Sequence, residues 1–211
     1  MKTERLIAVL ASDTVRRAPL NRMFWGVAAG GGLGAFALMV LTLGLRPALM
    51  DAMADPLVAA KSALPAVLFL GAAALALRLD RPDGRAGRLA PALILVPVVA
   101  AVLAVATLMD NPPGDWWRLT KGDTMIWCVV SIPVLALPVL AALLAVLRRG
   151  APAAPARAGL AAGLASGAAA AFVYSLHCPE DSPLFFGAWY TTGILLMTAA
   201  GGWAGARFLR W

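Results

Sequence analysis

Six stretches of mostly apolar residues follow one another along the chain, and each is about 20 residues or longer. A helix of about 20 residues crosses a hydrocarbon core of about 30 Å, because each residue adds about 1.5 Å. Helices satisfy their own backbone hydrogen bonds in lipid, and the alternation typical of a membrane barrel is absent. The sequence therefore predicts an all-α integral membrane protein, a bundle of six transmembrane helices. The expected spans are about residues 24–45, 57–78, 90–109, 125–147, 158–177 and 184–206.

Charged residues lie between these stretches and are unevenly distributed. Of the 18 Lys and Arg residues, fourteen lie in the two terminal segments and in the second and fourth connections. The remaining four basic residues and most of the acids lie toward the other side, in the other connections or, for Lys61, near the start of the second span. Cytoplasmic segments of membrane proteins are enriched in Lys and Arg, so we expect both termini to be cytoplasmic. This distribution also argues against direct binding to nucleic acid, which the net charge of +7 alone would suggest.

These boundaries divide the chain into three parts. Residues 1–23 form a cytoplasmic amphipathic segment, residues 24–207 the transmembrane domain, and residues 208–211 a cytoplasmic tail. No short apolar run with a small-residue cleavage site precedes the first span, so we expect no removable signal peptide.

The N-terminal segment has the pattern of a short amphipathic helix. Thr3 can cap it, and Leu6, Ile7 and Leu10 form its apolar face. One interpretation is a helix that lies on the lipid surface, with nearby arginines on anionic headgroups. The other is a helix that docks into a groove of a cytosolic partner. The residues alone leave both open.

The two cysteines are far apart in sequence but fall at the same side of the predicted membrane. Cys128 lies about one turn into the fourth span, and Cys178 lies at the outer end of the fifth. Three interpretations follow from this placement: a structural disulfide, a pair that responds to redox conditions or metal, or two unrelated buried thiols.

The turn that carries Cys178 reads "SLHCPEDSP" and gathers further donor atoms. His177, Glu180 and Asp181 could add ligands to a soft or borderline ion held by Cys128 and Cys178. No metal-binding spacing such as CxxC supports a preformed site. Pro, Asp and Ser are also common in ordinary solvated turns.

Motifs of common enzyme classes are missing from the sequence. It has no Walker A loop, no GxSxG and no HExxH, and its single His has no partner for a relay. Lys61 is the only ionisable residue inside the predicted spans, and we expect it to extend to the nearby membrane surface. An ion-coupled transporter usually places acids near the midplane, and the predicted spans contain none. Because the motifs of common enzyme classes are missing, we expect no enzymatic activity and no required cofactor.

Glycines recur at four-residue spacing in spans one, five and six. Gly26, Gly30 and Gly34 follow this period in the first span, and Gly159, Gly163 and Gly167 in the fifth. Such a stripe lets another helix approach closely. Packing within one bundle is favoured over a dimer interface.

Several of these features resemble a known family. They are the start "MKTERLIAVLASD", the six spans, a Cys early in the fourth span, and the stretch "LHCPEDSPLFFGAWYTTGI". Over essentially the whole chain, the sequence resembles the NrsF family of bacterial integral-membrane anti-sigma factors. The resemblance implies a multi-pass protein of the bacterial inner membrane that binds an extracytoplasmic-function sigma factor and holds it inactive. It also implies that Cys128 and Cys178 form a periplasmic pair that senses oxidants or heavy metals.

With this resemblance, the apolar face of Leu6, Ile7 and Leu10 is predicted to bind the sigma factor. The predicted function is sequestration of that factor and its release under heavy-metal or oxidative stress, with a transient heavy-metal ion as the one expected ligand. The alternative is a small transporter or channel-like protein with structural cysteines, for which the sequence offers hardly any polar path at midplane depth.

Overall fold

The computed structural model describes residue 3 and residues 20–210, and every regular element within them is a helix. Six of its helical segments are long and apolar enough to cross a membrane, which confirms the predicted all-α bundle. The spans are α2 (Leu20–Thr42), α4 (Pro56–Leu79), α5 with α6 (Leu89–Asp110), α8 (Met125–Leu147), α9 (Pro155–Ser175) and α10 (Pro183–Phe208). The predicted face of Leu6, Ile7 and Leu10 lies outside the described residues.

The helix bounds differ from the predicted ones where glycine and proline intervene. The first span begins at Leu20, and it ends at Thr42 because Gly44 adopts a left-handed conformation with φ of 79°. The third span is broken into α5 (Leu89–Ala92) and α6 (Leu95–Asp110). Pro97 has no N–H to donate to the carbonyl of Leu93, which accepts from Val96 instead.

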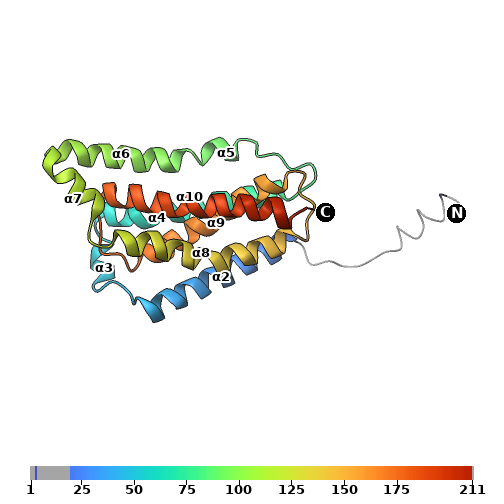
Figure 1. Cartoon of the computed structure of the whole chain (residues 1–211), viewed down its shortest axis with the longest axis horizontal. Helices are drawn as coiled ribbons and strands as arrows, with labels where there is room; N and C mark the ends of the chain where they lie inside the picture. Colours follow the sequence, from blue (N-terminus) through green and yellow to red (C-terminus); the bar gives the residue numbers. More distant parts are fainter. Residues whose placement is uncertain (1–2, 4–19, 211) are drawn as a thin grey trace.

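Shorter helices occur in the connections and were not predicted. They are α3 (Leu49–Ala52), the 3-10 turn η1 (Pro113–Asp115) and α7 (Trp116–Lys121). They shorten the path between neighbouring spans at one end of the bundle (Figure 1).

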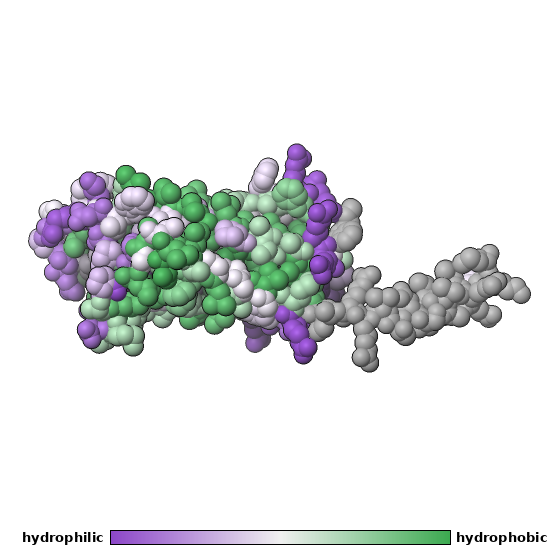
Figure 2. Space-filling model, turned by 90° about the horizontal axis from the view of Figure 1, so that it is seen from below, coloured by the Kyte–Doolittle hydropathy of each residue, from purple (hydrophilic) through white to green (hydrophobic). Residues whose placement is uncertain are grey.

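The bundle has two polar ends, separated by an apolar surface (Figure 2). The connections 43–55, 111–124 and 176–182 form one end, here called the acidic end. The start of α2, the connections 80–88 and 148–154, and the end of α10 form the other, the basic end (Figure 1). An apolar middle between two polar ends is the surface expected of a protein that crosses a bilayer.

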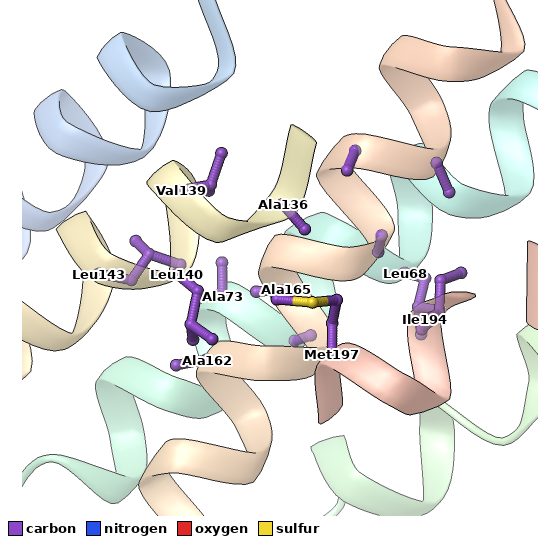
Figure 3. Close-up of a cluster of buried hydrophobic side chains, with 14 of the residues drawn as sticks. Leu68, Ala73, Ala136, Val139, Leu140, Leu143, Ala162, Ala165, Ile194 and Met197 are labelled. Carbon is purple, nitrogen blue, oxygen red and sulfur yellow. The ribbon is translucent and has the colours of Figure 1, made fainter. Parts of the chain in front are cut away.

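Helix α9 lies at the centre of the bundle and is the most buried of the six spans. It packs against α10, α4 and α8, whose side chains meet in the core shown in Figure 3. The labelled members of this core are Leu68, Ala73, Ala136, Val139, Leu140, Leu143, Ala162, Ala165, Ile194 and Met197. Helix α6 is peripheral and has no buried residue.

Glycines allow the closest of these approaches. A Cβ added to Gly201 would lie 2.6 Å from the Cα of Gly163, and one added to Gly205 would lie 2.6 Å from the Cα of Gly159. The stripe on α9 therefore packs within the bundle, as predicted. By contrast, Gly26, Gly30 and Gly34 of α2 have no described atom within 4 Å of an added Cβ.

Candidate functional site

Both cysteines lie at the acidic end and are fully buried. Cys128 is in the first turn of α8, and Cys178 follows the end of α9 by three residues. Each side chain is 0% exposed, and both thiols are free. The two residues lie near each other, and no disulfide joins them. The structure thus brings together the pair that the sequence placed at one depth.

The turn 176–182 is held by a buried lysine. The Nζ of Lys61 donates to the carbonyl oxygen of Cys178 at 2.8 Å and to that of Glu180 at 3.1 Å. It also forms an ion pair with Asp181 at 2.8 Å. Lys61 is 0% exposed, so the expectation that it extends to the membrane surface is wrong. Three oxygen acceptors satisfy an ammonium group that burial would otherwise penalise.

Asp181 binds a second cation at the same oxygen. The Nη1 of Arg46 donates to Oδ1 of Asp181 at 2.7 Å. Burial opposes ionisation of Asp181, but hydrogen bonds from Arg46 and Lys61, and their positive charges, outweigh it and lower its pKa. Asp181 is therefore a carboxylate that joins α4 to the segment after α2.

Backbone contacts attach the end of α2 to the same turn. The N–H of Arg46 donates to the carbonyl of Leu176 at 3.1 Å. The Nδ1 of His177 lies 3.0 Å from the carbonyl oxygen of Gly44, so it carries the proton in this contact. Movement of residues 176–178 would therefore displace Gly44 and Arg46, which closely follow α2.

Glu180 fixes the connection that leads into α8. Its Oε1 accepts from the backbone N–H of Asp123 at 2.8 Å. Gly122 lies beside it with φ of 55°, and a Cβ there would be 2.8 Å from the carboxyl carbon of Glu180 and 2.6 Å from the ring of Phe185. A side chain at position 122 would therefore push this connection away from the turn.

Polar hydroxyl groups surround the Cys178 thiol. Those of Thr124 and Tyr190 lie beside it, and the ring of Tyr174 lies 6.1 Å from that of Tyr190. All three hydroxyls are buried, and none has a hydrogen-bond partner of ordinary geometry among residues 20–210. Buried polar groups without a hydrogen-bond partner are uncommon. These hydroxyls could form new hydrogen bonds if the state of the thiol changed.

The thiol of Cys178 is in its protonated form at neutral pH. Burial raises its pKa, and this effect exceeds the opposing influence of the Lys61 charge and of nearby hydrogen-bond donors. A thiolate is the reactive species toward oxidants and soft metals. Reaction at Cys178 therefore requires loss of a proton and access through the turn.

The three predicted accessory ligands all have other partners. His177 contacts Gly44, Glu180 accepts from Asp123, and Asp181 binds Arg46 and Lys61. Over the described part of the chain, no group of three or more His, Cys, Asp and Glu residues is arranged to hold a metal ion. The accessory role of His177, Glu180 and Asp181 remains a prediction.

Lys61 and Arg46 are the site residues that sequence reasoning did not assign. A signal for Lys61 was present, because an ionisable residue inside an apolar span usually faces the bundle and has a partner. Asp181, at the same predicted depth, was an available partner. Arg46 gave no comparable signal, since it lies in a connection where exposed arginines are ordinary.

Comparison with known proteins then identifies the family. The model of the NrsF family, described as negative regulator of sigma F, matches residues 10–211. The chain belongs to the NrsF family. One relative, the "Probable anti-sigma-F factor NrsF" of Azospira oryzae, is 39% identical over 214 residues, and the match covers all of both chains. Another, the "Anti-sigma-F factor NrsF" of Caulobacter vibrioides, is 37% identical over 220 residues with the same full coverage. No solved structure gives a significant match.

Family membership fits the described site in one respect. The relatives are named as anti-sigma-F factors, and the site consists of contacts that hold the turn carrying Cys178. What the arrangement can do chemically is to exchange thiol protons for a covalent or metal bond and so disturb the contacts around Lys61.

Proposed function

We propose that the chain is an anti-sigma factor of the bacterial inner membrane. It holds an extracytoplasmic-function sigma factor inactive and releases it when Cys128 and Cys178 react with an oxidant or a heavy-metal ion. The observation that carries this proposal is the full-length match to two anti-sigma-F factors, together with six spans of membrane length. A regulator of this kind binds its partner in a stable complex and has no turnover.

The proposed docking element is the apolar face of Leu6, Ile7 and Leu10. Replacing Leu6 and Leu10 with Asp places two charges against an apolar groove, at a cost of several kcal/mol in binding. The measurement is co-purification of the sigma factor with full-length protein from detergent. A control that replaces Ala8 and Ser12 with Asp adds the same charge on the opposite face of the predicted helix and should retain the factor. Retention by the Leu6→Asp, Leu10→Asp protein would exclude this face.

The proposed switch is a bond between the two sulfurs, directly or through a soft ion. Moving a regulator from mostly bound to mostly free requires a free-energy difference of about 5 kcal/mol between the two states. A disulfide or a thiolate–metal bond is of this order, whereas exposed carboxylates are not. Because Cys178 is buried and protonated, the resting state is stable until a reagent removes its proton.

The proposed route to the output end runs through α2. The turn that carries Cys178 holds Gly44 and Arg46, directly after α2, and α2 begins at the end of the bundle from which the N-terminal segment continues. A change at the cysteines is thereby linked to the segment that carries the docking face.

Cysteine variants test the switch separately from the docking. Cys128→Ser and Cys178→Ser should each abolish sigma release by cadmium or diamide, and the double variant should match either single one. Repression without stress should persist. If the cysteines serve only the fold, each variant will instead lower the amount of protein in the membrane. A normal stress response from a well-expressed Cys178→Ser protein would contradict the switch.

The proposed orientation places the acidic end in the periplasm, which follows from the basic residues at the other end. A reporter that is active only in the periplasm should be silent when fused after residue 211. Activity of that fusion would put the cysteines on the cytoplasmic side and remove the oxidising compartment from the proposal.

A further inference from the structure

A long apolar groove runs between α4, α6 and α10, and Lys61 and Tyr190 of the cysteine site line part of it. Its volume is about 340 Å³, and it extends along α4 from the side chain of Lys61 to Leu75. Fourteen residues of helix correspond to about 21 Å. The groove therefore runs over most of the thickness of a hydrocarbon core of about 30 Å. It exists because α6 packs loosely along the bundle and has no buried residue.

A second cavity continues the groove at the basic end. Its volume is about 410 Å³, and Leu75 and Leu164 line both spaces. Two arginines line this second cavity, Arg85 from the connection after α4 and Arg157 from the start of α9. Neither forms a salt bridge with another residue of the described chain. Two arginines thus line the cavity at the basic end of a mostly apolar groove.

We propose that the two cavities form one binding site for an anionic phospholipid. Its phosphate lies between Arg85 and Arg157, and an acyl chain lies in the groove between α4, α6 and α10. The groove length of about 21 Å accommodates a chain that spans one leaflet, about half of the 30 Å core. Guanidinium groups bind phosphate oxygens through paired, charge-assisted hydrogen bonds.

The bilayer is the source of this ligand because both parts of the site match a lipid at the correct depth. The arginines belong to the basic end, where headgroups lie, and the groove is lined by residues of the membrane-spanning helices. A soluble anion would use only the arginines and would leave the apolar groove without an occupant. Basic pockets between transmembrane helices are known positions for anionic headgroups.

The headgroup part is tested by native mass spectrometry of the full chain in detergent. Phosphatidylglycerol and phosphatidylethanolamine with identical acyl chains are titrated, and phosphatidylglycerol should bind more tightly. In Arg85→Gln, Arg157→Gln this preference should fall by about 25-fold, or about fivefold for each arginine. The control is Arg81→Gln, Arg88→Gln, which removes two arginines of the same connection that do not line the cavity. Equal binding of the two lipids, or an equal loss in the control, would overturn the proposal.

The acyl part is tested by filling the groove. Ala100→Phe places a ring in it, while Ala101→Phe places the same ring on the neighbouring exposed position of α6. Ala100→Phe should weaken binding of both lipids, and Ala101→Phe should not. Inorganic phosphate at millimolar concentration should not displace phosphatidylglycerol. Displacement by phosphate, or unchanged binding in well-folded Ala100→Phe, would show that the arginines bind a soluble anion and that no chain occupies the groove.

Discussion

Lys61 and Asp80 lie near opposite ends of the same helix, α4, and both are withdrawn from solvent, yet their surroundings differ completely. Lys61 is 0% exposed and has three oxygen partners, whereas Asp80 is 1% exposed and neither carboxyl oxygen has a partner among the described residues. Asp80 also has the unfavourable sign for its position, since it is the C-cap of α4 and anions are disfavoured at a helix C-terminus. The acidic end compensates its buried charge, and the basic end does not.

The two groups resolve this problem in different ways. Lys61 stays charged because carbonyl and carboxylate oxygens replace its water. Burial raises the pKa of Asp80 to about 6, so the carboxyl is uncharged over a wider range of pH. Its backbone is fully used, since its N–H donates to Ala76 and its carbonyl accepts from Ala151. The comparison shows that the turn carrying Cys178 is held through the oxygen partners of Lys61. The Asp80 carboxyl, at the opposite end of α4, has no such partners among the described residues.

The largest expected effect is the loss of Lys61. Lys61→Met leaves the carbonyls of Cys178 and Glu180 without their donor and should lower the free energy of unfolding by about 3 kcal/mol. The measurement is denaturant unfolding of the detergent-solubilised protein. Lys121→Met, which removes an exposed lysine at the same end, should change it by less than about 0.5 kcal/mol. Equal effects would mean that the contacts of Lys61 do not hold the turn.

Replacing Asp80 should raise the free energy of unfolding at neutral pH, whereas replacing Lys61 lowers it, and the size of the increase should depend on pH. A pKa raised from 3.8 to about 6 means that the folded state binds the proton more tightly than the unfolded state. The stability from protonated Asp80 is fully present below about pH 4 and is lost as pH rises through about 6, a change of about 3 kcal/mol. Asp80→Asn should remove this slope when unfolding is measured from pH 4 to pH 8. Parallel curves for the two proteins would contradict it.

Gly150 offers a steric test of the same carboxyl. A Cβ at position 150 would collide with the Asp80 carboxyl group, although Gly150 itself has an ordinary negative φ. Gly150→Ala should therefore cost about 1–2 kcal/mol in unfolding free energy. In the Asp80→Ala background, the same change should be nearly neutral, because the colliding oxygens are gone. An equal cost in both backgrounds would place the strain elsewhere.

The smallest expected effect is that of Arg46. Its side chain is 19% exposed and Asp181 is 33% exposed, so water screens this ion pair more than it screens the Lys61 contacts. Arg46→Gln should lower the unfolding free energy by less than about 1 kcal/mol. If Arg46→Gln lowers the unfolding free energy as much as Lys61→Met does in the same assay, the two cations contribute equally to holding Asp181.

The sequence predicted the six spans but not which of them lies at the centre of the bundle. Hydropathy located all six, because apolar length is what a bilayer requires. The Ala- and Gly-rich α9 is less hydrophobic than the four spans before it, yet it is the most buried of the six. Lipid gives apolar side chains no advantage in the bundle centre, so close packing of small residues decides which helix lies there.

The candidate site could be predicted only in part. Topology brought Cys128 and Cys178 to one end, and the structure places both there, buried and unbonded. The sequence indicated that Lys61 would need a partner, but its contacts with the carbonyls of Cys178 and Glu180 depend on how α4 is rotated in the bundle, which the sequence does not give. The break between α5 and α6 follows from Pro97, but hydropathy averages over such a break.

The backbone contact between α9 and α10 also has a genetic consequence. Any missense change of a glycine codon adds a side chain, and at Gly159, Gly163, Gly201 and Gly205 the added Cβ would meet main-chain atoms that cannot rotate away. In a library of single-codon changes, intolerant positions should follow this seam. The glycine-rich α2 should accept alanine at positions 26, 30 and 34, where an added Cβ has no described atom within 4 Å.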